Sequence, residues 1–119
     1  MKNIFHPAAF LPNGEVDRQR IERAAYKVIA PLVQGIGAAI LPPAPAMEWL
    51  RHTVIALYNM GQPAEFADAL KLLYALARLS GPPDMEPYLC HPAAASYFML
   101  SCLAVVENLT EGAAPAGVD

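Results

Sequence analysis

The chain has 119 residues, of which 55% are apolar and 16% are charged, and its net charge is −3 at neutral pH. The length fits one domain, and the negative charge disfavours a nucleic-acid binder, which usually displays a basic surface. The apolar share exceeds the usual ~45–50%, so we expect apolar side chains in excess of one core. A subunit or partner interface is the favoured place for this excess.

The sequence disfavours a membrane span and an export route. The longest apolar run, Ala93 to Val106, is shorter than the ~20 residues that cross a bilayer. The N-terminus carries one lysine and then Pro7 before any long apolar stretch, unlike a secretory signal. Cys90 and Cys102 would lie roughly 15–18 Å apart on one helix, which is too far for a disulfide. We therefore expect a cytoplasmic protein with free thiols.

Residues 1–13 are expected to form an extended N-terminal arm, because Pro7 and Pro12 interrupt any regular structure there. The apolar residues of this arm could pack on a neighbouring molecule. A first helix is predicted after Asn13-Gly14. Its apolar positions recur at helical spacing, namely Ile21, Ala25, Val28 and Leu32. Pro31 lacks an amide hydrogen and crowds the carbonyl four residues earlier, so this helix should kink or end near Ala30.

Two further helices are predicted to pair as an antiparallel hairpin, because only about three residues join them. The first covers Ala46 to Asn59 and closes at Gly61. The second begins at Pro63, which suits the first helical position, and ends at Gly81-Pro82-Pro83. Each helix carries a main apolar stripe and a second one on another face, so both are expected to bury two faces. The second stripes consist of Trp49, Thr53, Ala56 and Met60 on one helix and of Leu72, Leu76 and Leu79 on the other.

The last predicted helix runs from Pro92 to about Thr110 and ends at Gly112. It carries no charge between Pro92 and Val106 and is apolar on every side, which favours a central place in the core or in a dimer. Residues 113–119 are expected to be disordered. The predicted fold is an all-α bundle of about four helices over residues 14–112, and the expected assembly is a homodimer.

Catalytic and metal-binding patterns are absent from the sequence. Cys90, His91, His52 and Cys102 lack the paired spacing of a structural zinc site. A Cys90 or Ser96 nucleophile beside His91 would lack a third group to orient the base. We expect neither an enzyme nor a metal or cofactor.

Half of the Lys and Arg residues lie in one ten-residue segment of the first predicted helix. They are Arg18, Arg20, Arg23 and Lys27. Three of these side chains share one helical face, which could meet an acidic partner. The same face could instead be solvated and balanced by Glu15, Asp17 and Glu22. Trp49 also allows two interpretations, because an amphipathic aromatic residue can anchor an interface or belong to the core.

Two segments carry a resemblance to a known family: Met47 to Tyr58, with the sequence MEWLRHTVIALY, and the helix predicted from Glu65 to Leu79. Together with the size, the helical organisation and the lack of catalytic motifs, they resemble small helical antiactivators of bacterial quorum sensing. The resemblance implies that the chain binds a LuxR-type transcription factor. It further implies that the chain covers the surface through which that regulator dimerises, so that DNA binding fails.

The residues themselves indicate a non-enzymatic binding protein that uses one apolar face for a second copy and another for a protein partner. The candidate interface residues are Trp49, Met60, Leu72, Leu76 and Leu79. The alternative is a binder of a small apolar ligand. Its interior would then be formed by Trp49, Tyr58, Tyr74, Phe98 and Met99.

Overall fold

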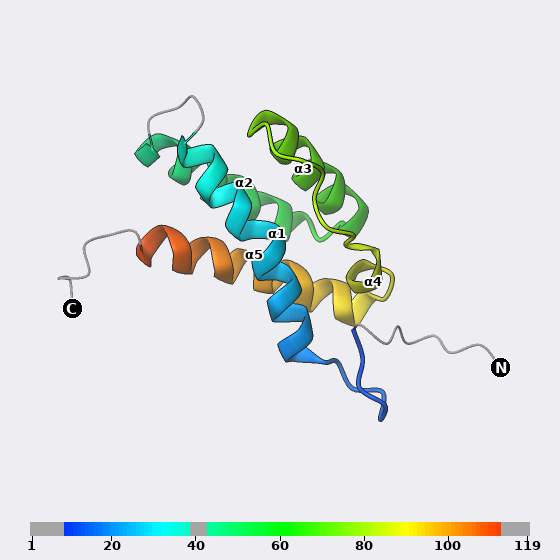
Figure 1. Cartoon of the computed structure of the whole chain (residues 1–119). Coiled ribbons are helices and arrows are strands. Elements are labelled where there is room, and N and C mark those ends of the chain that lie inside the picture. Colours follow the sequence, from blue (N-terminus) through cyan, green and yellow to red (C-terminus); the bar gives the residue numbers. More distant parts are fainter. Residues whose placement is uncertain (1–8, 39–42, 113–119) are drawn as a thin grey trace.

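The computed structural model describes residues 9–38 and 43–112. Within these residues the chain forms five helices and no strand (Figure 1). They are α1 (Arg18–Ala38), α2 (Pro43–Met60), α3 (Pro63–Leu76), α4 (Glu86–Leu89) and α5 (Pro92–Gly112). The predicted all-α bundle is confirmed, and the single-turn α4 is an addition to it. Residues 1–8 of the predicted arm and residues 113–119 of the predicted tail lie outside the described residues.

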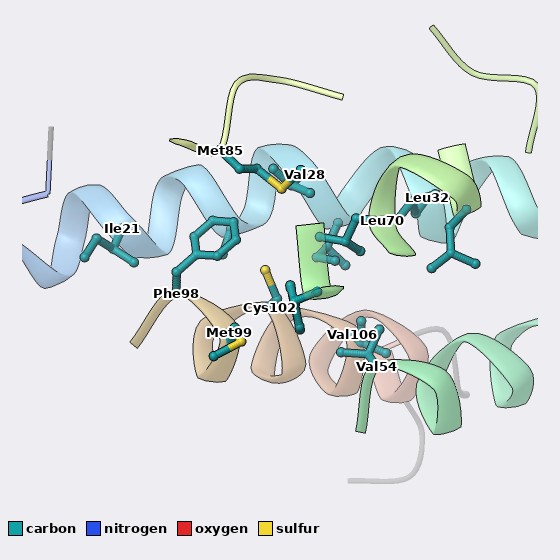
Figure 2. Close-up of a cluster of buried hydrophobic side chains, with 14 of the residues drawn as sticks. Ile21, Val28, Leu32, Val54, Leu70, Met85, Phe98, Met99, Cys102 and Val106 are labelled. Carbon is teal, nitrogen blue, oxygen red and sulfur yellow. The ribbon is translucent and has the colours of Figure 1, made fainter. Parts of the chain in front are cut away.

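The core is built around α5, which contacts each of the other four helices and makes its largest contact with α1. Along α5, the side chains of Ala94, Phe98, Cys102 and Val106 are buried at four-residue intervals, as expected for one face of a helix. Figure 2 shows Phe98, Cys102 and Val106 from α5 in one apolar cluster with Ile21, Val28 and Leu32 from α1. Of the two places predicted for the last helix, the core or a dimer, the place in the core is confirmed.

The 18-residue stretch Pro92–Leu109 of α5 is long and apolar enough to cross a membrane by length and composition alone, with a mean hydropathy of 1.3. Its contacts with all the other helices are those of the core helix of a bundle. Core helices of soluble proteins have the same length and composition, so this stretch is weak evidence for a span.

The first helix continues past Ala30, so of the two outcomes predicted there, a kink or an end, the end is wrong. Pro31 lies inside α1, which continues to Ala38. Ile29, Leu32 and Val33, on both sides of the proline, are buried. Burial of these side chains, at about 1.5–3 kcal/mol each, outweighs the ~3 kcal/mol that proline costs inside a helix.

The link between α2 and α3 matches the sequence signals. Gly61 has a φ of 66°, the left-handed conformation that suits glycine after a helix, and Pro63 opens α3. The two helices contact each other, as a hairpin requires, although α2 packs more extensively on α5 and α1. Figure 1 shows α3 turning back along the bundle after this link.

The third helix ends at Leu76, well before the predicted end at Gly81, and this prediction is wrong. Arg78 takes a left-handed φ of 59°, and its N–H donates to the carbonyl of Ala75 at 3.0 Å. The next N–H, of Leu79, donates to the carbonyl of Tyr74 at 2.9 Å. These two bonds form a Schellman turn, which closes the helix with a residue other than the usual glycine.

The described end of the predicted arm folds back on its own bundle. Phe10 forms a single antiparallel β-bridge with Val16, and the N–H of Asp17 donates to the carbonyl of Ala9 at 2.8 Å. The ring of Phe10 lies edge-on to that of His91, with centroids 4.9 Å apart. Ala9 and Phe10 are thereby buried against the start of α5 rather than extended toward a neighbour.

Candidate interaction surface

The inner face of α3 is fixed to the bundle by apolar packing and one buried hydrogen bond. Phe66, Leu70 and Leu73 are buried, and the hydroxyl of Tyr74 donates to the carbonyl of Val28 on α1 at 2.6 Å. Burial raises the pKa of Tyr74, and the nearby Cys102 thiol acts in the same direction, so the hydroxyl keeps the proton that it donates. With its inner face anchored in this way, α3 presents its other face to solvent.

The outer face of α3 carries two leucines that the bundle does not cover. Leu72 is 62% exposed and Leu76 is 55% exposed. Because four residues separate them, they lie on the same side of the helix, one turn apart. Ala75 beside them is also exposed. We call Leu72, Ala75 and Leu76 the α3 patch.

The helix α2 carries a second exposed apolar pair. Trp49 is 44% exposed and Met60 is 53% exposed. About three helical turns separate them, so both point to the same side of α2. We call this pair the α2 patch. The exposure of Trp49 favours its interpretation as an interface residue over its interpretation as a core residue.

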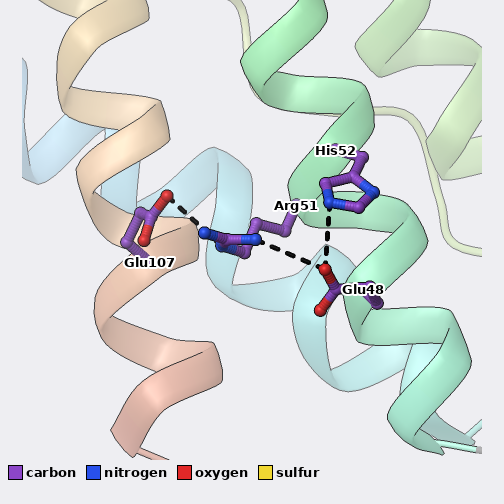
Figure 3. A network of polar contacts seen from close by, with 4 residues as sticks. All are labelled: Glu48, Arg51, His52 and Glu107. Carbon is purple, nitrogen blue, oxygen red and sulfur yellow. Dashed lines mark hydrogen bonds and ion pairs between the residues drawn. The ribbon is translucent and has the colours of Figure 1, made fainter.

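A network of polar contacts holds α2 against α5 (Figure 3). The Nε atom of Arg51 lies 3.3 Å from Oε2 of Glu107 on α5, and its Nη1 atom lies 3.4 Å from Oε2 of Glu48. His52 approaches the same Glu48 oxygen through Nε2 at 3.0 Å. These groups are partly exposed, so each pair is worth about 0–1 kcal/mol. The Arg51–Glu107 pair joins α2 to α5, whereas the two contacts of Glu48 lie within α2.

Leu79 does not belong with the other predicted interface residues. The Schellman turn at Arg78 directs Leu79 toward α1, where a Cβ atom added to Gly35 would lie 3.2 Å from its Cδ1. Leu79 is half-buried and packs against the core. The five predicted residues therefore divide into the α2 patch, two leucines of the α3 patch and one inward residue. The helical spacing that joined Leu79 to Leu72 and Leu76 fails because α3 ends before it.

The residues predicted to enclose an apolar ligand are not assembled around one cavity. Tyr74, Phe98 and Met99 are buried in the core, whereas Trp49 is exposed. Tyr58 is half-buried, and it lines a surface hollow of about 620 Å³ together with Met99. The core aromatic rings pack on one another instead, with Phe66 edge-on to Phe98 and Tyr88 stacked on it.

Only some of the positive charges on the basic face of α1 have a partner within the described part of the bundle. Arg20 pairs with Asp17, with Nε and Oδ2 3.8 Å apart, and Arg18 lies over the ring of Tyr97 at 5.5 Å from its centroid. Arg23 and Lys27 are exposed and line a shallow hollow, together with Tyr26, Gln19 and Glu22. Both interpretations of this face, an acidic partner or a solvated surface, remain consistent with the geometry.

The structure places the residues considered for catalysis and metal binding in different surroundings. Cys102 is buried, and burial raises its pKa, so the thiol stays protonated. His91 accepts a hydrogen bond from the N–H of Ala93 through Nδ1 at 3.2 Å, at the start of α5. Cys90 and His52 are exposed. Within residues 9–38 and 43–112, no group of three His, Cys, Asp or Glu side chains could hold a metal ion.

The sequence did not single out two exposed apolar side chains. Tyr26 on α1 is 52% exposed and Leu100 on α5 is 43% exposed. Leu100 lies in a helix that is apolar on every side, so the sequence offers no signal for which side faces solvent. Tyr26 lies among the basic residues of α1, where its neighbours suggested a charged surface.

Comparison with known proteins adds no relative to these observations. No family model, curated protein or solved structure matches the chain. The fold and the surface define a small all-α protein with uncovered apolar patches on two helices.

Proposed function

We propose that this chain is a non-enzymatic, cytoplasmic regulator that binds a LuxR-type transcription factor and covers the surface through which that factor dimerises. The observation that carries the binding role is the outward position of Leu72 and Leu76, each more than half exposed on one side of α3. The choice of a LuxR-type partner is supported by the resemblance of Met47–Tyr58 and Glu65–Leu79 to quorum-sensing antiactivators.

The exposed side chains of both patches are apolar and gain free energy when an interface buries them. Burial of a leucine side chain contributes about 1.5–3 kcal/mol relative to full exposure, and a few anchor residues carry most of the binding energy of an interface. Tryptophan is prominent among such anchors, and Trp49 is the single tryptophan of the chain. A specific interface also buries about 800 Å² of surface on each partner. The residues around a patch must therefore contribute to the buried area as well.

The proposal includes a homodimer, with one patch used for the second copy and the other for the regulator. A regulator subunit held by this chain is removed from the pool that dimerises on DNA, so inhibition follows from mass action. Sedimentation of Met60→Glu and Leu76→Glu variants distinguishes the two patches, because a charge placed in the self-interface dissociates the dimer. If both variants and the parent chain sediment as monomers, the homodimer is excluded.

The test of the regulatory role is a DNA-binding competition. Purified chain is titrated into a complex of a LuxR-type regulator from the same host with its operator DNA, followed by fluorescence anisotropy. We expect the parent chain to release the DNA and Leu76→Glu to require at least about tenfold more protein, a loss of one interface anchor. Ala64→Glu is the matched control, because it adds the same charge at an exposed position of α3 outside the α3 patch.

Each outcome decides a separate part of the proposal. If the parent chain leaves the DNA complex intact, the LuxR-type partner is wrong. If Leu76→Glu releases DNA as well as the parent chain does, the α3 patch is not the contact. Circular dichroism establishes that the variants remain helical.

A further inference from the structure

A groove runs along the first half of α5, apart from the residues of the α3 patch. It is made of two hollows of about 620 Å³ and 280 Å³. Tyr58 and Ser96 line both hollows, so the two hollows lie side by side. The end of α2 and the start of α3 border one hollow, and the start of α1 borders the other. We call the combined depression the α5 groove.

Along the smaller hollow, α5 contributes a row of exposed, uncharged side chains. Ala93, Ser96 and Leu100 are all exposed, and their spacing of three and four residues places them on one side of α5. The first two are small, so the backbone of another segment can approach closely. Leu100, at the end of the row, offers an apolar contact that is 43% exposed.

The shape of the groove favours a linear occupant. From Pro92 to Leu100, α5 borders the groove for about 12 Å at 1.5 Å per residue, which matches roughly two turns of a helix. A compact ligand would fill one hollow and leave the other open, whereas a helix lying across Tyr58 and Ser96 would cover both. Helices that bind in this way place apolar residues at positions i, i+4 and i+7 into the groove.

The charge of the groove further specifies its occupant. Among the residues that line the two hollows, Arg18 is the charged one. Its guanidinium rests over the ring of Tyr97, and no carboxylate of the described residues forms an ion pair with it. The adjacent carboxylate of Glu22 instead accepts a hydrogen bond from the Tyr97 hydroxyl. A cation beside an otherwise uncharged groove is complementary to an acidic residue beside an apolar stripe.

We propose that the α5 groove binds an amphipathic helix of a partner protein, with an apolar stripe over Ala93, Ser96 and Leu100 and an Asp or Glu that pairs with Arg18. The negative net charge of the chain disfavours nucleic acid as the occupant. The inference uses no residue of the α3 patch, so it stands or falls separately from the proposed regulatory role.

The test uses the full chain and a designed helical peptide with leucines at i, i+4 and i+7 followed by a glutamate. Binding is followed by ¹⁵N-resolved NMR. We expect saturable shifts at Tyr58 and along Ala93 to Leu100, with the α3 patch unaffected. Ser96→Trp fills the groove and should weaken binding at least about tenfold. Ala104→Trp is the matched control, because Ala104 is exposed on the same side of α5 and lies beyond the lining residues.

A charge reversal tests the role of Arg18. Arg18→Glu should weaken binding of the glutamate peptide and strengthen binding of the same peptide with lysine in that place. Arg23→Glu, on the exposed side of α1 outside the groove, should change neither preference. Leu76→Glu changes the α3 patch and not the groove, so this variant should bind the peptide as the parent chain does. A failure of the proposed function at the α3 patch therefore leaves the peptide result unchanged.

Three results would overturn the inference. The first is the absence of saturable shifts up to about 1 mM peptide, the weak end of measurable affinities. The second is equal binding by Ser96→Trp and the parent chain. The third is saturation of the 620 Å³ hollow by a small apolar molecule that the peptide does not displace, which would make the hollow a ligand pocket.

Discussion

Leu70 and Leu72 lie two residues apart on α3, yet Leu70 is fully buried and Leu72 is 62% exposed. The same residue type therefore serves as core on one face of the helix and as uncovered surface on the other. The inner face meets α1 and α5, where Tyr74 adds a hydrogen bond to Val28. The outer face meets solvent. The comparison shows that leucine content alone does not reveal how many faces of α3 the bundle buries.

The largest expected difference in stability lies between a leucine shortened on the inner face of α3 and one shortened on its outer face. Leu70→Ala should destabilise the fold by about 2–5 kcal/mol, because it leaves a cavity in the core. Leu72→Ala should change stability by less than about 0.5 kcal/mol, as a surface substitution. Urea unfolding followed by circular dichroism measures both. Equal losses for the two variants would show that the outer face is covered in solution, by a second copy or by other parts of the chain.

Alkaline pH provides a second comparison, between the buried and exposed cysteines. Burial raises the pKa of Cys102, so above about pH 8.5, the ordinary thiol pKa, the unfolded chain releases a proton that the folded chain retains. Stability is therefore fully present below that pH and should fall by about 1–2 kcal/mol between about pH 8 and pH 10. Cys102→Ala should flatten this loss, whereas Cys90→Ala should not. Identical pH dependence for all three proteins would contradict a sealed Cys102.

A smaller effect is expected at the end of α3, where the turn separates the outward leucines from the inward Leu79. Arg78 has a φ of 59°, which glycine adopts without strain, so Arg78→Gly should stabilise the fold by about 0.5–1 kcal/mol. Gly61→Ala is the opposite control: with a φ of 66° and open space around its Cβ position, it should cost about 1 kcal/mol. Thermal unfolding measures both, and a loss of stability in Arg78→Gly would mean that the arginine makes contacts that outweigh its strain.

Much of the fold was predictable because proline and glycine mark helix ends directly. Pro63, Gly61 and Pro92 fixed the limits of three helices within a residue or two. The helix end that Pro31 suggested did not form, because tertiary burial outweighed a local penalty. The end of α3 was misplaced because a Schellman turn formed with arginine at the position where glycine is usual. The single turn of α4 is too short for a periodic signal.

The candidate site was predictable only in part. Helical spacing alone places Leu72 with Leu76 and Trp49 with Met60 on one side of a helix, and the structure shows that these four side chains are exposed. The patterns did not reveal that α3 stops before Leu79. The α5 groove was also hidden, because its hollows are bordered by residues from α1, α2 and α5 that only the packing of the helices brings together.

The difference in access between the two thiols has a practical consequence. Cys102 is sealed in the interior and Cys90 lies exposed at the rim of the larger hollow, so a maleimide dye or spin label added to the folded chain should attach at Cys90 alone. The unmodified sequence thus provides a single spectroscopic reporter beside the α5 groove, without any engineered attachment point.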